Sequence, residues 1–183
     1  MSTLMVRAFV AWELSEEMQQ HLADAQDVLK KSTARLTFVD PALIHITVKF
    51  LGEVDEKKIP QVISALTALK FPRIPIRGKH ITVNNPTRPH TIWCAIESSD
   101  KCQDVFSAVE TVLYPLGFPR ETRRFTPHAT LARVKEPDAS LFRCLEELKS
   151  VPCGNSIIDG IKLKKSTLTP RGPIYEDICE VKW

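Results

Sequence analysis

His45-Ile46-Thr47-Val48 and His128-Ala129-Thr130-Leu131 are near copies of one His-x-Thr-x motif, and this repetition decides how the chain is organised. An apolar strand and then an amphipathic helix are predicted before each copy. The spacing also matches: 38 residues separate Arg7 from His45, and 37 separate Thr91 from His128. The pattern therefore predicts a duplication, with halves near residues 1–85 and 90–183 joined into one domain over 1–183.

Each half is predicted to contain a strand, a helix, the motif strand, a second helix and closing strands. In the first half Ser15 caps a helix to about Lys31, because its hydroxyl can accept from a free backbone N–H of the first turn. The motif lies on a strand over 43–51. The other elements of this half are strands 6–12, 36–39 and 74–83 and a helix over 56–69.

The second half repeats this order. A helix runs from Ser99 or Asp100 to Leu116 and stops at Gly117, and another runs from Pro137 to Lys149. The predicted strands are 91–97, 124–134, 157–168 and 174–181, the last two joined through Pro170-Arg171-Gly172-Pro173. This order predicts an α+β, bilobal protein with a pseudo-twofold axis, two mainly antiparallel sheets flanked by helices, and a cleft between the lobes.

The repeated motif suits acid–base chemistry. Alternate residues of a strand lie on the same face of the sheet, so His45 shares a face with Thr47, and His128 shares a face with Thr130. Ile46, Val48, Ala129 and Leu131 then pack the opposite face. Imidazole has an ordinary pKa of about 6.5, so one neutral ring can take a proton from water while one charged ring protonates a leaving oxygen. Such a pair can open a cyclic phosphodiester without a metal, while the threonines hold the phosphate oxygens.

A third copy of the motif, His80-Ile81-Thr82-Val83, lies on the last strand of the first half. The second half has no equivalent histidine there. We therefore expect His80 to be a strand residue without a catalytic role.

Charge and cysteine content limit the class of protein. The net charge of +3 is too small to indicate nucleic acid by itself, but residues 57–96 contain seven Lys or Arg and no Asp or Glu. A second basic cluster, Arg120, Arg123, Arg124, Arg133 and Lys135, surrounds the second motif. Such clusters attract phosphates, although a solvated basic face is the alternative. Five cysteines without a Cys-x-x-Cys pair favour reduced thiols and a cytoplasmic location, and no apolar stretch is long enough to span a membrane.

The sequence lacks the residue patterns that other catalytic chemistries need. A two-histidine zinc site usually needs a third His, Cys or carboxylate, and neither motif contains Asp or Glu. The sequence also has no glycine-rich nucleotide loop and no Gly-x-Ser-x-Gly elbow. We therefore expect no metal and no cofactor.

The chain resembles the two-histidine (2H) phosphoesterases, and among them the bacterial and archaeal RNA 2′,3′-cyclic phosphodiesterases, also called 2′-5′ RNA ligases. The resemblance rests on the segments 45–52 (HITVKFLG) and 124–133 (RFTPHATLAR), supported by 7–11, 115–118 and 168–175. It implies a bilobal fold and hydrolysis of a terminal 2′,3′-cyclic phosphate to a 2′-phosphate, with a reversible 2′-5′ ligase activity.

The resemblance also implies roles for single residues. His45 would protonate the leaving 3′ oxygen and His128 would activate water. Arg133 would contact the phosphate, although strict alternation sends it to the opposite face unless the strand contains a bulge. Lys49 has the correct parity for the cleft and is the competing candidate.

The implied partner is RNA ending in a 2′,3′-cyclic phosphate, such as a tRNA fragment, and a monomer is the default assembly. Two alternatives stay open. One is a phosphodiesterase for small cyclic nucleotides, and the other is a non-catalytic RNA- or nucleotide-binding module.

Overall fold

The computed structural model of the protein describes residues 4–97, 99–170 and 172–183, so Arg171 of the predicted turn lies outside the described residues. The helices are α1 (Glu16–Leu29), α2 (Ile59–Thr67), α3 (Asp100–Leu113) and α4 (Ala139–Glu147). The strands are β1 (Met5–Glu13), β2 (Arg35–Phe38), β3 (His45–Asp55), β4 (Ile74–Val83), β5 (Thr91–Ile96), β6 (His128–Glu136), β7 (Asn155–Ile158), β8 (Gly160–Thr169) and β9 (Gly172–Lys182).

Most predicted boundaries agree with these elements. Ser15 caps α1, and its Oγ accepts a hydrogen bond from the backbone N–H of Met18. Gly117 ends the turn of 3₁₀ helix that follows α3, with a φ of 88° in the left-handed region that favours glycine. The structure therefore confirms the start of the first helix and the stop of the third.

Several predicted boundaries are wrong. The motif strand predicted over 124–134 begins only at His128. The strand predicted over 157–168 is divided into β7 and β8, and Asp159 lies between them. Pro137 precedes α4, which is capped by Asp138 through the backbone N–H groups of Ser140 and Leu141. The helix predicted from residue 56 begins as a 3₁₀ turn over Glu56–Lys58, and α2 starts at Ile59.

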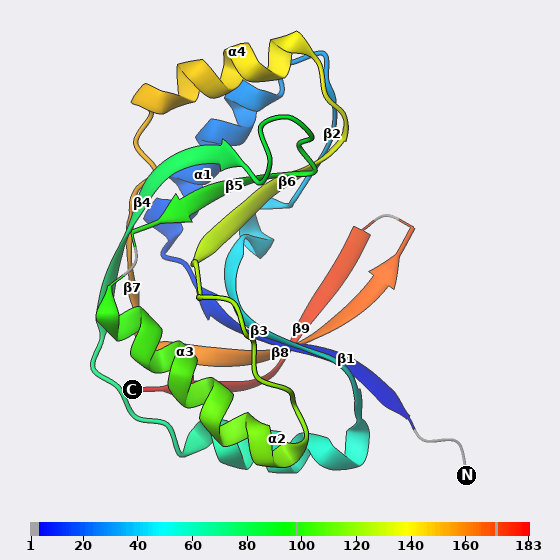
Figure 1. Cartoon of the computed structure of the whole chain (residues 1–183), viewed down its shortest axis with the longest axis vertical. Coiled ribbons are helices and arrows are strands. Elements are labelled where there is room, and N and C mark those ends of the chain that lie inside the picture. The colour runs from blue at the N-terminus through cyan, green and yellow to red at the C-terminus, as the bar shows by residue number, and fades with distance from the viewer. Residues whose placement is uncertain (1–3, 98, 171) are drawn as a thin grey trace.

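Figure 1 shows two lobes, with helices covering the outer side of each. The upper lobe contains α1, α4, β2, β4, β5 and β6, and the lower lobe contains α2, α3, β1, β3, β8 and β9. The lobes therefore differ from the sequence halves. α1 belongs to the first half but packs on β6, and α3 belongs to the second half but packs on β3.

The strands form one antiparallel sheet instead of the two that the sequence predicts. Its order is β7-β4-β5-β6-β3-β1-β8-β9, and β2 pairs with β6. The connection between the lobes is narrow, because β3 and β6 pair at Ile46 and Ala129. A continuous buried core runs through both lobes and includes Trp12, Ile46, Leu131 and Leu163. The duplication thus folds as one curled sheet with the two motif strands at its centre.

Candidate active site

The two motifs meet where the lobes join. Ile46 pairs antiparallel with Ala129, and both side chains are fully buried. In this register His45 comes opposite Thr130, and Thr47 comes opposite His128. All four of these side chains are half-buried on the other face of the sheet, which we call the motif face. In a regular antiparallel ladder, diagonal neighbours such as His45 and His128 lie about 7–8 Å apart, with their Cβ atoms somewhat closer.

The two imidazoles are held in the same way. The Nδ1 of His45 lies 2.8 Å from the carbonyl oxygen of Leu43, and the Nδ1 of His128 lies 2.8 Å from that of Thr126. A carbonyl can only accept, so each Nδ1 is the donor and carries a proton. In each ring Nε2 is then the atom that can exchange a proton with a ligand. Pro127 contributes to this geometry because it holds Thr126 extended.

A β-bulge occurs at the same place in both motif strands. Val10 pairs with Lys49 and Ala11 with Thr47, so Val48 has no partner in β1. In the second motif Ile92 pairs with Ala132 and Trp93 with Thr130. Leu131 is therefore the corresponding extra residue, and in both strands the bulge is three residues after the histidine.

The bulge decides where the next side chains point. After it, Val48 and Lys49 are both buried, and Phe50 is 74% exposed. In the second motif Arg133 occupies the position of Phe50 and is exposed. Its Nη1 donates to Oγ1 of Thr91 at 2.7 Å. The bulge that Arg133 needs to reach the motif face is therefore present.

The prediction for Lys49 is wrong for the same reason. The parity argument assumed regular alternation, and the bulge at Val48 turns Lys49 toward α3. Its Nζ donates to Oε1 of Glu110 at 2.6 Å and to the carbonyl oxygen of Pro119 at 2.7 Å. Both side chains of this ion pair are buried. Lys49 is thus a structural residue beneath the site.

Aromatic rings surround His45. Its ring centroid lies 5.1 Å from Phe9 and 5.3 Å from Tyr175, and Phe9 also packs against Tyr175 at 5.2 Å. Burial lowers the pKa of His45 from its ordinary value, outweighing the hydrogen bond to Leu43 and the charge of Glu13, which act to raise it. The Nε2 atom lies 3.1 Å from Oγ1 of Thr47. The neutral form of His45 is therefore favoured when no ligand is bound.

His128 has a different neighbour. The ring of Trp93 on β5 lies 4.4 Å from it, centroid to centroid. Across the motif face, burial raises the pKa of the Tyr175 hydroxyl, although the positive charges of Arg133 and Lys164 act to lower it. Arg133 on the upper lobe thus lies within electrostatic range of Tyr175 on the lower lobe, so the two lobes contribute to one site.

Sequence reasoning missed the lining of the site. Phe9, Trp93 and Tyr175 touch a motif histidine, and Glu13 and Lys164 act on His45 electrostatically. Lys164 pairs with Glu13 at 2.6 Å and with Asp177 at 2.7 Å. These residues come from strands distant in sequence. Knowledge of how the strands pair could have identified these lining residues. The sequence around each of them contains no local pattern that marks it as part of the site.

The structure also places the third motif. His80 and Thr82 lie on β4, where His80 is exposed and Thr82 is half-buried. His80 pairs with Ala95 on β5, which in turn pairs with His128. His80 is therefore a strand residue, separated from His128 by one strand.

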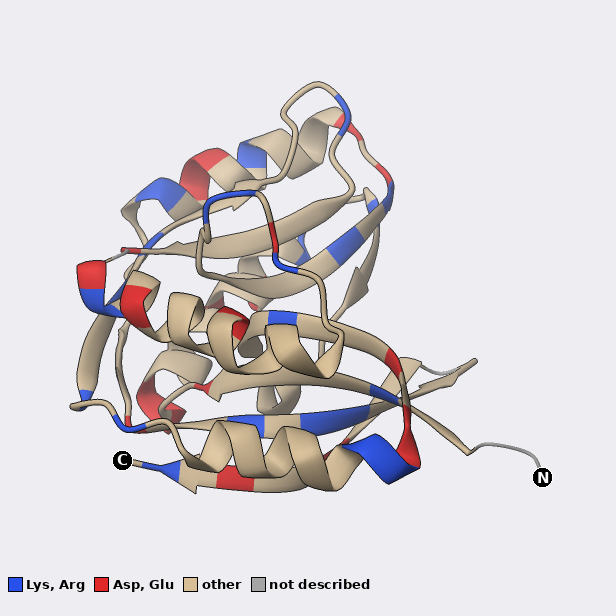
Figure 2. Ribbon diagram, turned by 60° about the horizontal axis from the view of Figure 1, so that its bottom comes forward, with Lys and Arg blue, Asp and Glu red and all other residues tan. Residues whose placement is uncertain are grey.

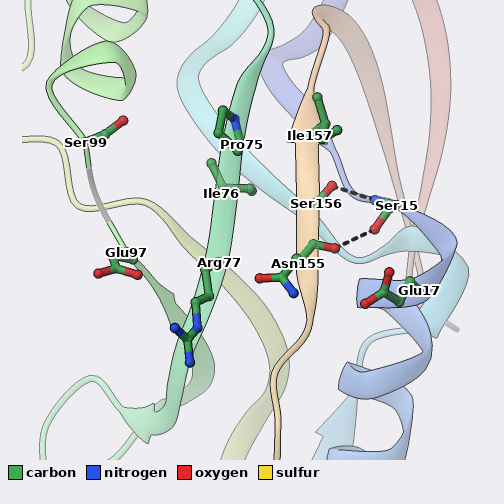
Figure 3. A pocket seen from close by; sticks show the side chains of 10 residues that line it. All are labelled: Ser15, Glu17, Pro75, Ile76, Arg77, Glu97, Ser99, Asn155, Ser156 and Ile157. Atoms are coloured by element: carbon green, nitrogen blue, oxygen red, sulfur yellow. Dashed lines mark hydrogen bonds between the residues drawn. The ribbon is translucent and has the colours of Figure 1, made fainter.

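Two hollows in the structure lie away from the motifs. The larger, of about 720 Å³, is formed by the start of α1, the loop before α3, β4 and β7, as Figure 3 shows. In this hollow Ser15 donates from its backbone N–H to Ser156 Oγ and from its Oγ to the carbonyl oxygen of Asn155, each at 2.8 Å. The second hollow adjoins it and includes Lys79 and Lys149. Neither contains a motif residue, so the cleft predicted at the motifs stays a prediction.

Among residues 4–97, 99–170 and 172–183, no group of three or more His, Cys, Asp or Glu side chains is arranged to hold a metal ion. Within the same ranges, no helix has the length and apolar character needed to cross a membrane. Figure 2 shows basic residues spread over both lobes, with acidic residues between them.

The sequence matches a known family model in two segments. The model, described as LigT like Phosphoesterase, matches residues 13–93 and again 96–175. The first match includes the motif at His45 and the third copy at His80, and the second match includes the motif at His128.

Two curated relatives cover almost the whole chain, and both are named RNA 2′,3′-cyclic phosphodiesterase. The protein from Methanothermobacter thermautotrophicus is 34% identical, over 94% of this chain and 96% of its own. The protein from Methanocaldococcus jannaschii is 37% identical, over 96% and 99%. A crystal structure of a protein from Thermus thermophilus has the same fold, with a TM-score of 0.81, 24% identity and coverage of 96% and 97%.

Proposed function

Because this chain belongs to the LigT-like phosphoesterases, we propose that it hydrolyses the 2′,3′-cyclic phosphate at the end of an RNA to a 2′-phosphate without a metal. The observation that carries this proposal is the matched pair of histidines. Each presents Nε2 to the motif face while Nδ1 is bonded to a backbone carbonyl. The names of the relatives support the choice of substrate.

In the proposed reaction His128 and His45 act on opposite sides of the phosphorus. Nε2 of His128 accepts a proton from water as the water oxygen forms a bond to phosphorus. The bond from phosphorus to O3′ breaks, and Nε2 of His45 gives its proton to that oxygen. The products are a free 3′-hydroxyl and a 2′-phosphate. With the 5′-hydroxyl of a second RNA in place of water, the same steps in the same direction form a 2′-5′ linkage and a free 3′-hydroxyl, and their reverse cleaves that linkage.

The donor role requires His45 to carry a second proton. Burial lowers the pKa of this histidine in the unliganded protein, which works against that state. An anionic phosphodiester bound beside the ring favours the charged form and raises the pKa again. We propose that substrate binding itself charges His45.

We propose that three side chains hold the phosphate. Thr47 and Thr130 lie on the motif face opposite the two histidines, and each hydroxyl can donate to a non-bridging oxygen. Arg133 is exposed beyond the bulge and carries a guanidinium suited to paired phosphate oxygens. These groups would stabilise the charge that builds on the oxygens as water attacks.

The cellular setting is part of the proposal. RNA with a cyclic phosphate end, such as a tRNA fragment, is the proposed partner. The five cysteines are all unpaired, which supports a cytoplasmic location. Both motifs come from one chain, and this supports a monomer as the active form.

The test is end-group analysis in excess EDTA. An oligoribonucleotide ending in a 2′,3′-cyclic phosphate is incubated with the wild-type protein and with His45→Ala and His128→Ala, and the product is mapped. We expect a 2′-phosphate from the wild type and almost none from either variant, with unchanged thermal unfolding.

Other results would redirect the proposal. Saturable RNA binding without turnover would indicate a binding module. Turnover that EDTA abolishes would indicate a metal-dependent reaction. Turnover of small cyclic nucleotides alone would indicate the smaller substrate class.

A further inference from the structure

The third His-x-Thr-x motif lies in register with the second. Across three neighbouring strands, His80 pairs with Ala95, and Ala95 pairs with His128. One row further along, Thr82 pairs with Trp93, and Trp93 pairs with Thr130. Directly paired residues of an antiparallel sheet point to the same face. The third motif is therefore on the motif face, two strand spacings or about 10 Å from the second.

The intervening strand leaves this face open. Between the two motifs β5 contributes Ala95, which is small, and Trp93, whose ring packs against His128. The register shift between Gly78 and His80 makes Lys79 an extra residue in β4. Both Lys79 and His80 are exposed as a result. On the motif face, β4 thus offers the imidazole of His80 and the hydroxyl of Thr82, one strand from Ala95 and Trp93.

The opposite face of β4 has a separate structural role. At Gly78 this face packs so closely that there is no room for a side chain. A Cβ atom added to Gly78 would lie 2.3 Å from the Cβ of Cys153. Ile81 and Val83 are buried in the core. Core packing therefore accounts for Ile81 and Val83 but not for His80 and Thr82, which face away from it.

We propose that His80 and Thr82, together with Trp93, form a subsite for the nucleotide that precedes the cyclic end of the RNA. This inference rests on the proposed function. A terminal cyclic phosphate blocks the 3′ side, so the rest of such an RNA extends only in the 5′ direction. A polar and aromatic surface on the motif face, one strand from His128, meets a nucleotide of that 5′ segment. The imidazole and hydroxyl bind its phosphate or ribose, and the indole offers a stacking surface.

The subsite predicts a dependence on substrate length. We compare His80→Ala and Thr82→Val with the wild type on two substrates, a nucleoside 2′,3′-cyclic phosphate and a tetranucleotide ending in the same group. For each variant we expect kcat/KM to fall roughly tenfold on the tetranucleotide, mainly through KM. On the mononucleotide it should change by less than twofold. His21→Gln, on α1 at the other face of the sheet, is the matched control.

Each outcome decides the proposal. An equal fall in kcat/KM on both substrates would show that His80 acts in the catalytic centre or stabilises the fold, and would overturn the subsite. An unchanged kcat/KM on both substrates would also overturn it. If the wild type hydrolyses neither substrate, the proposed function fails first. Binding of a 2′-phosphorylated tetranucleotide, followed by fluorescence anisotropy, then separates the two ideas. Weaker binding by His80→Ala would retain the subsite, and equal binding would overturn it.

Discussion

In the lower lobe His45 lies between Phe9 and Tyr175, whereas in the upper lobe His128 packs against Trp93. The backbone around the two rings is nevertheless the same, with each Nδ1 bonded to a carbonyl two residues earlier and a bulge three residues later. Past the bulge, the lower lobe has Phe50 where the upper lobe has Arg133. The duplication thus fixes the same backbone geometry around both histidines, and the side chains around them make the two positions unequal.

A buried polar side chain supports each motif strand, and these two side chains also share a position but differ in chemistry. Gln26 is the eleventh residue of α1, and its Nε2 donates to the carbonyl oxygens of Val39 and Leu131. Glu110 is the eleventh residue of α3 and accepts from Lys49 and from the backbone N–H of Glu121. In each lobe a buried polar residue at the same helix position holds the segment after the motif histidine. One lobe uses a neutral amide and the other an ion pair.

The largest effect is expected from removing either histidine. His45→Ala and His128→Ala should each lower kcat about 10²–10⁴-fold, the usual contribution of a general acid or base. Steady-state rates over pH 5–9 sharpen the comparison, because each variant should lose a different limb of the bell-shaped profile. A loss of the same limb in both would show that the rings do not divide the acid and base roles.

The next effect concerns stability. Lys49→Met leaves Glu110 buried without its cation, and we expect a loss of about 3–5 kcal/mol in the free energy of unfolding. Gln26→Leu should cost about 1–3 kcal/mol, because it removes hydrogen bonds without leaving a charge. Urea denaturation followed by circular dichroism measures both values.

The double variant Lys49→Met/Glu110→Leu is the control for the ion pair. It removes both charges, so it should recover most of the stability lost in Lys49→Met. A double variant as unstable as the single one would show that packing, and not the unpaired charge, causes the loss.

Arg133 and Phe50 test the positions beyond the bulge. Arg133→Ala should raise KM roughly tenfold, because it removes a charged hydrogen-bond donor to the phosphate. It should also reduce the slope of log(kcat/KM) against log[salt] by about 0.7, the value for one lost phosphate contact on a single strand. Phe50→Ala removes no charge and should leave that slope unchanged. Equal slopes for wild type and Arg133→Ala would contradict the phosphate contact.

The smallest effect is a dependence of stability on pH. Burial lowers the pKa of His45, so between that lowered value and about 6.5 the unfolded chain binds more protons than the folded one. The stability contributed by neutral His45 is complete above about pH 6.5 and falls as the pH drops through this window. Thermal unfolding of His45→Gln should therefore change less between pH 7.5 and pH 5 than that of the wild type. Parallel curves would show that His45 titrates alike in both states.

The sequence by itself determined the paired motifs, and it is the basis of the chemistry proposed for them. Two histidines that follow similar strands at similar distances are a pattern visible in the sequence. The alternation of side chains along a strand is then enough to place His45 on the same face as Thr47, and His128 on the same face as Thr130. The helix start at Ser15 and the stop at Gly117 also depend on neighbouring residues alone, and the structure confirms both.

Only the tertiary structure decided which residues beyond the motifs reach the site. The bulges at Val48 and Leu131 depend on pairing with β1 and β5, and they turn Lys49 into the core and Arg133 out of it. The exchange of α1 and α3 between the lobes, and the alignment of His80 with His128, are likewise set by strand register. Register joins residues far apart in the chain, so no local pattern could have predicted it.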